Sequence, residues 1–389
     1  MENKERALAH IEKIEWIRPI EGADNIELIG VLGWVCVAKK GEFNVGDMAV
    51  YIEIDSKCPE TDEKFAFLAN KKFKVKTMKL GKFKVISQGL ALPLSLFPEL
   101  QDKKIGDDVT EALKITYASE EDAARKTNKI DPNAKYKSMA KRRPKLFANP
   151  IVRKIMRYSI GRKIMFLLFG RKKDNPKKFP DWIIKTDETR IENAPFYLQS
   201  TEKWIKTEKC DGTSCTFAVD RLKNGKNKFD FIVCSRNVRQ ADREQACYHE
   251  SNIYWELADK YDIEKILTQF ATENNYNRVV LQGEGVGSVQ GNPYKFTENK
   301  LFVFNLIIDG TRLGTVEMAD FCKSHGLTSV PIIDTAYELP KTMEEMKLEA
   351  DGYSELNPKV KREGFVYRDI LGQKSFKNVS REYLLKHEI

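Results

Sequence analysis

The sequence has few histidines and no paired cysteine motif. It contains four histidines and seven cysteines in 389 residues, and no two cysteines form a CxxC pair. The cysteines are Cys36, Cys58, Cys210, Cys215, Cys234, Cys247 and Cys322. A structural zinc site needs clustered thiolates or imidazoles, so this composition argues against one. The odd number and scattered placement favour reduced thiols, and therefore a cytoplasmic or nuclear protein.

Long apolar runs are also absent. Near the middle of the chain the longest run is Ile164–Phe169, far short of the ~20 residues needed to cross a bilayer. The first ten residues contain no apolar signal segment. We therefore expect a soluble protein, with no membrane among its partners.

Acidic residues are nearly missing from one segment. The whole chain carries 66 Lys and Arg against 57 Asp and Glu, a net charge of +9. Between Lys141 and Lys178 there are fourteen basic residues and one acid, Asp174. The rest of the chain is therefore slightly acidic, and the basic character that suggests a polyanionic partner belongs to this segment.

Residues 1–117 are expected to form a compact β-rich domain. Strand-like runs at 7–20, 26–38 and 48–54 are separated by turn signals such as Lys40-Gly41 and Gly46-Asp47. Short strands at this spacing predict a small barrel or sandwich. An OB-type barrel is a common nucleic-acid platform, and a barrel with a purely structural role is the alternative.

Residues 118–178 are predicted to be a basic, partly helical linker. Apolar residues recur at near-helical spacing among Arg and Lys. They are Ile151, Ile155, Met156, Ile160, Ile164, Met165 and Phe169. The pattern indicates an amphipathic helix, or a helical pair broken near Gly161. A linker packed on one of the domains is the favoured interpretation, with an RNA-steering surface and a membrane-surface helix as alternatives.

Residues 179–389 are predicted to form an α+β domain. Strand-like runs lie at 229–234, 279–282, 301–308 and 364–367, and helical stretches at 245–259 and 318–325.

The sharpest local signal is Lys209-Cys210-Asp211-Gly212-Thr213. A lysine amine becomes nucleophilic when its environment lowers its pKa, and a nearby glycine permits close approach to a nucleotide. Alone, this pentapeptide is as consistent with a surface turn. Charged and aromatic residues follow it in order: Arg236, Glu284, Phe302, Phe304, Glu363, Lys374 and Lys377. This set of residues suits nucleotidyl transfer. Cations can offset phosphate charge, carboxylates can bind a metal and a ribose, and an aromatic ring can stack on a base.

In this order the segments resemble the motifs of covalent nucleotidyltransferases, which include RNA ligases, DNA ligases and mRNA-capping guanylyltransferases. The resemblance implies that Lys209 is the nucleophile, with Asp211 beside it, and that Arg236 and Glu284 contact the ribose. It implies that Phe304 stacks on adenine, with Phe302 as the alternative, and that Glu363 is associated with the metal.

The closing motif of these enzymes usually has two lysines separated by one residue, and here the spacing is wider. Lys374 is therefore the preferred ligand of the α-phosphate, and Lys377 is the weaker match. In an extended strand Lys374 and Phe376 would share one face and Lys377 the other. The expected nucleotide-binding set is completed by Glu208, Gly212 and Val366.

Two further segments resemble RNA ligases in particular. The segment Lys185-Thr186-Asp187-Glu188-Thr189-Arg190 is similar to an entry segment of these enzymes, which implies that Lys185 and Arg190 contact pyrophosphate or the donor phosphate. The N-terminal segments 19–24, 33–34, 46–51, 55–56 and 87–90 are similar to the OB domain of the fifth RNA ligase family, where it precedes the nucleotidyltransferase domain. The implied fold is α+β: an OB-type barrel (1–117), the basic linker (118–178) and an ATP-grasp-like ligase domain (179–389).

The resemblance implies a monomeric ATP-dependent RNA ligase, of the kind used in RNA repair, that requires Mg²⁺ or Mn²⁺. Its expected substrate is a 3′-OH/5′-phosphate nick in duplex RNA or in an RNA/DNA hybrid. A capping guanylyltransferase or a DNA ligase is the alternative within the superfamily, although these usually carry the OB domain after the catalytic domain. A non-catalytic OB-type RNA-binding protein is the alternative from another class.

Overall fold

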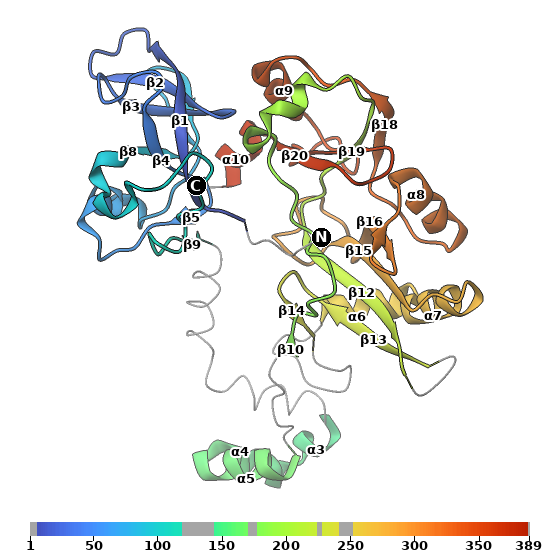
Figure 1. Ribbon diagram of the computed structural model, residues 1–389. Helices are drawn as coiled ribbons and strands as arrows, with labels where there is room; N and C mark the ends of the chain where they lie inside the picture. The colour runs from blue at the N-terminus through green and yellow to red at the C-terminus, as the bar shows by residue number, and fades with distance from the viewer. Residues whose placement is uncertain (1–5, 119–143, 170–176, 224–227, 241–251, 388–389) are drawn as a thin grey trace.

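The computed structural model describes residues 6–118, 144–169, 177–223, 228–240 and 252–387. Figure 1 shows a β-rich N-terminal domain beside a larger α+β domain, and a group of helices that projects away from both. This agrees with the predicted order of domain, linker and domain. The six cysteines in the described part are all buried and unpaired.

The N-terminal domain is built on a five-stranded antiparallel sheet of order β3-β2-β1-β4-β8. Its strands are β1 (Ala9–Pro19), β2 (Ile26–Val31), β3 (Trp34–Lys39), β4 (Met48–Ile52) and β8 (Leu90–Pro93). The first half of β1 pairs with β4 and the second half with β2, with an irregularity between Ile14 and Trp16. The long strand is therefore shared by both halves of the curled sheet. Shorter elements complete the domain: β5 (Ser56–Lys57), β6 (Met78–Leu80), β7 (Val85–Ser87), β9 (Thr116–Tyr117) and the 3-10 helix η1 (Glu63–Lys71).

The run expected as one strand at 26–38 is a hairpin, β2 and β3, that reverses at Leu32-Gly33. Leu32 has a φ of 52°, a left-handed conformation that an apolar residue rarely adopts. Gly33 is required because a Cβ there would lie 2.8 Å from the Cα of Glu192 in the other domain. The sequence did not predict this turn, because Gly33 is the only residue of Leu32-Gly33 that favours a turn.

The linker forms the helices α3 (Pro144–Ala148), α4 (Pro150–Arg157) and α5 (Ser159–Phe169). The helical break lies at Tyr158 and not at Gly161, which falls inside α5. A Cβ at Gly161 would lie 2.1 Å from the carbonyl oxygen of Ile155, so the glycine permits the close approach of the two helices. No described helix is long and apolar enough to cross a membrane.

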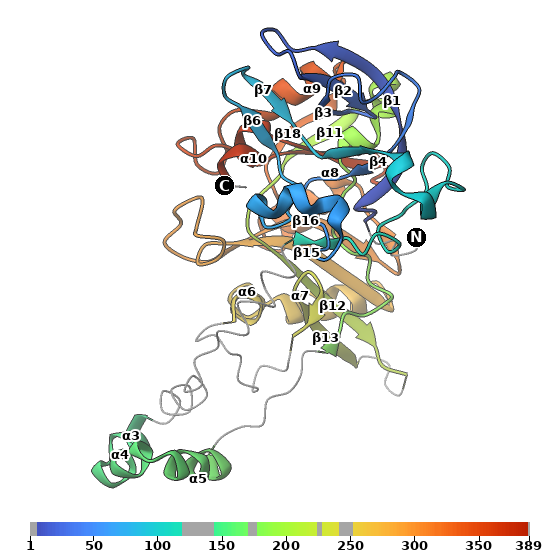
Figure 2. The ribbon, with the colours of Figure 1, turned by 90° about the vertical axis from the view of Figure 1, so that its left-hand side faces the viewer.

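The expected packing of this linker on a domain is not seen. Figures 1 and 2 both show α3, α4 and α5 standing apart from the two domains. Their apolar cluster consists of residues from within the group: Phe147, Met165, Leu146, Val152 and Met156. We call the unit formed by residues 144–169 the helical projection.

The C-terminal domain contains a seven-stranded antiparallel sheet of order β10-β14-β13-β12-β15-β16-β17. Its strands are β10 (Lys177–Lys178), β12 (Thr213–Arg221), β13 (Phe229–Cys234), β14 (Val238–Arg239), β15 (Arg278–Val286), β16 (Lys300–Ile308) and β17 (Thr311–Arg312). The helices α6 (Ile253–Lys260), α7 (Ile263–Glu273) and α8 (Thr315–Ser324) pack on one face through a shared apolar core. Of the helix expected at 245–259, residues 245–251 lie outside the described part.

A second sheet, of order β18-β11-β19-β20, completes this domain. Its strands are β11 (Trp204–Glu208), β18 (Ile332–Tyr337), β19 (Gly364–Asp369) and β20 (Ser375–Val379). Tyr367 and Phe376 stack in its core with ring centroids 5.0 Å apart. The helix α9 (Met343–Ala350) contributes Met346 to the same core. Because β11 belongs to this sheet and β12 to the larger one, the connection between them lies where the two sheets meet.

The two domains are joined through the segment around η4 (Ile191–Asn193). The amide of Gly33 donates to the carbonyl of Glu192 at 2.8 Å. The Glu192 carboxylate, 1% exposed, pairs at 2.6 Å with Lys347 of α9, which is 0% exposed. The Lys347 ammonium also donates to the carbonyl of Val379 at 2.7 Å. This ion pair therefore ties the domain contact to α9 and to β20.

We expect Lys347→Met to destabilise the protein strongly, because it leaves the carboxylate of Glu192 buried without a counter-charge. Removing one partner of a buried ion pair costs about 3–5 kcal/mol in the free energy of unfolding. Urea denaturation should show the loss, and the added Glu192→Gln should recover part of it. The control is Lys178→Met in the exposed pair Lys178–Asp181, 83% and 81% exposed, with an expected change below about 1 kcal/mol. Equal effects of the two single substitutions would contradict the prediction.

Candidate functional site

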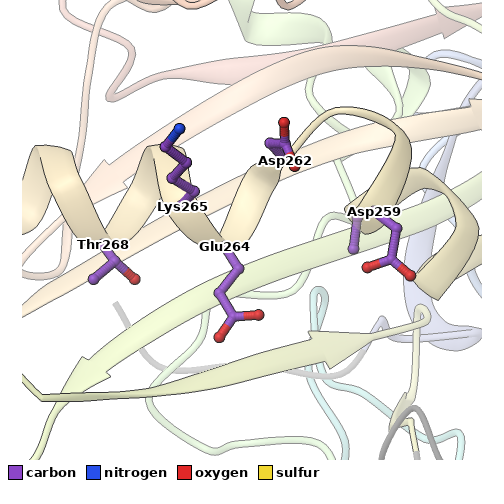
Figure 3. A pocket seen from close by; sticks show the side chains of 6 residues that line it. Asp259, Asp262, Glu264, Lys265 and Thr268 are labelled. Atoms are coloured by element: carbon purple, nitrogen blue, oxygen red, sulfur yellow. The ribbon is translucent and has the colours of Figure 1, made fainter.

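A cavity of about 400 Å³ lies at the junction of the two sheets and is closed on one side by the N-terminal domain. Its walls come from the β11–β12 connection, from β15, β16, β19 and β20, and from Arg6, Asp55 and Tyr117 of the N-terminal domain. A second hollow, shown in Figure 3, is a shallow surface on α6 and α7 lined by Asp259, Asp262, Glu264, Lys265 and Thr268, with Ala258. It contains none of the predicted site residues.

Lys209 follows β11 directly, and main-chain pairing sets its position. Strands β11 and β19 pair up to Glu208 opposite Phe365, and the amide of Lys209 then donates to the carbonyl of Gly364 at 3.0 Å. This brings the Lys209 ammonium to 2.7 Å from the carboxylate of Glu363. Gly212 is required nearby because a Cβ there would lie 2.4 Å from the carbonyl oxygen of Gly285.

Three neighbouring carboxylates determine the charge state of Lys209. Burial alone would lower the pKa of Lys209, but Glu363, Glu284 and Asp211 outweigh it and raise the pKa above its ordinary value. Burial raises the pKa of Glu284 to about 8 and also raises that of Glu363, and in each case Lys209 opposes the shift. Lys209 is therefore held as an ammonium, and another cation placed against these carboxylates would lower its pKa.

The donor set fits a magnesium or manganese ion. In the described part no group of three or more His, Cys, Asp and Glu side chains is arranged to enclose a metal. Mg²⁺, however, commonly takes one or two carboxylates together with substrate phosphates and keeps several waters. Glu363, which is half-buried and has a raised pKa, meets this need, and Glu284 lies close enough to add to the same field.

Phe304 lines the cavity at a point where β16 bulges. The register with β15 shifts between Gln282–Asn305 and Gly283–Val303, which leaves Phe304 unpaired. Its carbonyl accepts a hydrogen bond of 2.6 Å from Arg368 of β19. Phe304 is half-buried and lines the cavity, whereas Phe302 is 7% exposed in the core below. Simple alternation along β16 would place Phe302 and Phe304 on the same face. Because of the bulge, only Phe304 lines the cavity.

Glu208 and Val366 also line the cavity. The Glu208 carboxylate accepts from the hydroxyl of Ser354 and, at 2.7 Å, from the amide of Glu355. Both hydrogen bonds orient its side chain, so Glu208 has a fixed position beside Lys209.

Arg236 and Asp187 form an ion pair at the cavity mouth. The guanidinium of Arg236 donates to both carboxylate oxygens of Asp187, at 2.8 and 2.7 Å. It also lies 5.4 Å from the ring centre of Tyr117, which comes from the N-terminal domain. Arg236 is 43% exposed at the side chain and can therefore reach a ligand in the cavity.

The structure brings Lys377, and not Lys374, into the cavity. Lys374 precedes β20, and its exposed ammonium pairs with Glu202 at 2.7 Å, outside the lining. Lys377 lies opposite Val366 in the β19–β20 pairing, and its ammonium is 3.8 Å from Asp187. Lys374, predicted as the ligand of the α-phosphate, lies outside the cavity because β20 begins only at Ser375 and Lys374 belongs to the preceding turn. The identity of the α-phosphate ligand stays a prediction.

Lys377 has an altered proton affinity. Burial, with further repulsion from Arg190, lowers its pKa to about 7. Its amide donates to the carbonyl of Thr189 at 2.8 Å, which fixes β20 against the segment that carries Asp187. A phosphate placed beside Lys377 would supply the counter-charge that the protein gives only weakly.

The two cations predicted in the entry segment 185–190, Arg190 and Lys185, lie in different surroundings. Arg190 is buried, lines the cavity and pairs with Asp55 of the N-terminal domain at 2.9 Å. Two of its nitrogens, Nε and Nη1, have no hydrogen-bond partner in the described part. Lys185 is half-buried and is not part of the lining.

The lining also contains residues outside the predicted set, among them Arg6, Asp55, Tyr117, Arg368 and Tyr383. Arg368 could have been predicted from the sequence, because it lies two residues after Val366 and therefore on the same strand face. Asp55 belongs to a segment that resembles the OB domain of RNA ligases, but its place in the cavity, like that of Arg6 and Tyr117, depends on how the N-terminal domain docks. Arg6 and Arg190 both pair with Asp55, at 3.3 and 2.9 Å, so this carboxylate links the domains at the cavity wall.

Comparison with known proteins identifies the family. Residues 8–94 match the family model of an OB-fold domain, and residues 202–384 match that of RNA ligase. A search of curated proteins finds no match.

The chain is similar over its whole length to solved structures of an RNA ligase from Naegleria gruberi. The structure with PPi is 31% identical, with a TM-score of 0.75, and the match covers 98% of this chain and 99% of that one. A lysine-to-alanine variant with ATP and Mn and a lysine-to-methionine variant with AMP and Mn are each 30% identical, with TM-scores of 0.74 and the same coverage. The chain is thus an N-terminal OB-fold domain followed by an α+β ligase domain, and it belongs to the RNA ligase family.

Proposed function

We propose that this RNA ligase uses ATP and a divalent metal to form a covalent adenylate on Lys209, and that it seals 3′-OH/5′-phosphate nicks in duplex RNA. The observation that carries the proposal is the contact of 2.7 Å between the Lys209 ammonium and Glu363. It lies in a cavity that also holds Phe304, Arg236, Lys377 and Arg190. The similarity to a ligase solved with ATP and Mn supports the choice of nucleotide and metal.

In the first step, neutral Lys209 attacks the α-phosphorus of ATP. A phosphorus–nitrogen bond forms, the bond to the pyrophosphate oxygen breaks, and Nζ loses a proton. Magnesium or manganese supplies positive charge against the phosphates when bound, and Glu363 is the residue that would hold it. The cations Lys377 and Arg190 offset charge on the phosphates, and Phe304 stacks on the adenine.

The two later steps use the same residues. The AMP passes from Lys209 to the 5′-phosphate of the nick, which restores the lysine, and the 3′-OH then attacks the activated phosphate and releases AMP. Glu284 and Arg236 contact the ribose in this scheme, and both line the cavity. Asp211, whose amide donates to the hydroxyl of Tyr294 at 2.7 Å, is held beside the amine throughout.

The first prediction concerns the adduct. Wild-type protein with α-labelled ATP and magnesium should retain label after denaturation, and Lys209→Ala should retain none. The control Lys203→Ala removes an exposed lysine of the same segment and should leave the adduct unchanged. Chelation of the metal should also abolish labelling. A labelled Lys209→Ala protein would overturn the assignment.

The second prediction separates the two lysines of the closing segment. Lys377→Ala should reduce the rate of adduct formation by about 10²-fold or more, the usual size of effect for one group that stabilises transition-state charge. Lys374→Ala, which removes only a surface pair with Glu202, should change the rate less than about threefold. Rapid-quench measurement of adduct formation gives both values. The reverse order of effects would restore Lys374 as the phosphate ligand.

The third prediction concerns the substrate. On matched nicks the protein should seal an RNA 3′-OH strand faster than a DNA 3′-OH strand, with duplex RNA or an RNA/DNA hybrid as template. ATP should support the adduct and GTP should not. Equal sealing of all-DNA nicks would favour a DNA ligase, and adduct formation with GTP would favour a capping enzyme. Sedimentation of the active protein tests the expected monomer.

A further inference from the structure

The helical projection, residues 144–169, exposes an unusual amount of apolar surface. Seven large apolar side chains on α4, α5 and the residue between them are at least 38% exposed. They are Ile151 (70%), Ile155 (38%), Tyr158 (65%), Ile160 (70%), Ile164 (50%), Leu167 (84%) and Leu168 (65%). Large contiguous apolar patches on a soluble protein usually mark a binding surface.

These residues form a stripe along the projection. In α4, Ile151 and Ile155 have i, i+4 spacing, and the exposed Tyr158 follows at the break between the two helices. In α5, the spacing i, i+4, i+7, i+8 is that of Ile160, Ile164, Leu167 and Leu168. Residues so spaced share one helical face. The stripe is not the internal seam of the projection, because a separate set that includes Phe147 and Met165 forms that core.

A basic stripe accompanies the apolar one on both helices. On α4 the basic residues are Arg153, Lys154 and Arg157. Two of them, Arg153 and Lys154, follow Ile151 by two and three residues. On α5 the same offsets from Ile160 give Arg162 and Lys163. No acidic residue occurs between Pro144 and Phe169. Each helix therefore presents the same arrangement, with an inward seam, an outward apolar face and a cationic flank.

We infer that the helical projection is a membrane-surface anchor that binds bilayers containing anionic lipids. A helix lying in the interface buries its apolar face in the acyl boundary while its Lys and Arg contact the headgroups. Figures 1 and 2 show the projection well away from both domains, so the ligase domain is free to act beside the bilayer. Peripheral attachment requires no transmembrane helix, in agreement with the described helices.

Charge complementarity selects this occupant over the others. An RNA backbone would engage the cations but offers nothing to bury Ile151, Ile160, Ile164 and Leu167, since nucleic-acid contacts rely on phosphates and on stacking. A second copy would cover the apolar stripe but would bring two acid-free, basic projections together. An anionic lipid surface can bury the apolar stripe in its acyl region and pair with the basic stripe through its headgroups.

The experiment is flotation of the full-length protein with vesicles of phosphatidylcholine and phosphatidylglycerol, compared with phosphatidylcholine alone. Wild type should partition preferentially into the anionic vesicles, and less so at high salt. The variant Ile151→Ser/Ile160→Ser/Ile164→Ser/Leu167→Ser alters only exposed side chains and should lose at least about tenfold in partitioning. The variant Arg153→Gln/Lys154→Gln/Arg157→Gln/Lys163→Gln should lose at least as much, since each surface cation contributes roughly fivefold.

The matched control neutralises four lysines elsewhere, in Lys72→Gln/Lys79→Gln/Lys82→Gln/Lys84→Gln of the N-terminal domain, and should keep vesicle binding. All variants should form the Lys209 adduct in solution at the wild-type rate, which shows that they are folded. Vesicle binding by the apolar variant at the wild-type level would overturn the proposal. Two other results would also overturn it. In the first, wild type does not bind vesicles and the basic variant loses RNA affinity. In the second, light scattering shows that wild type self-associates and that the apolar variant does not.

Discussion

The contact between Lys209 and Glu363 is the constraint on which the site depends. It places the Lys209 amine against carboxylates that hold it charged, although burial by itself favours the neutral amine. In the proposed mechanism, Lys209 therefore stays an ammonium until positive charge arrives with the nucleotide and its metal. The main-chain hydrogen bond from Lys209 to Gly364 makes this contact a consequence of sheet pairing, so the two strands that bring it about cannot shift without disturbing the chemistry.

The domain contact serves the same cavity. Asp55 of the OB-fold domain pairs with Arg190, and the pKa of Lys377 is lowered by burial and by repulsion from Arg190. A few residues further on, Glu192 joins the Gly33 turn to Lys347 in the core of the ligase domain. Docking of the OB-fold domain thus does more than cover the cavity. It also brings Arg6 and Asp55 to the wall that contains Arg190 and Lys377.

The helical projection has a different physical character from the two domains. Its core is small, and its outward face combines aliphatic residues with cations and no acids. Leaving such a surface in water is unfavourable. None of its described residues lines the cavity that contains Lys209.

The sequence by itself determined the order of domains, several of the long strands and the candidate nucleophile. These follow from local patterns: the apolar runs of β13 and β16, the Lys209–Thr213 pentapeptide, and the charged residues that end strands. Tertiary structure alone decided which lysine enters the cavity, because β20 begins at Ser375 and leaves Lys374 in the preceding turn. It also separated Phe304 from Phe302 through a bulge and brought Arg6, Asp55 and Tyr117 to the wall. Strand ends, bulges and domain docking depend on long-range pairing, which local periodicity does not encode.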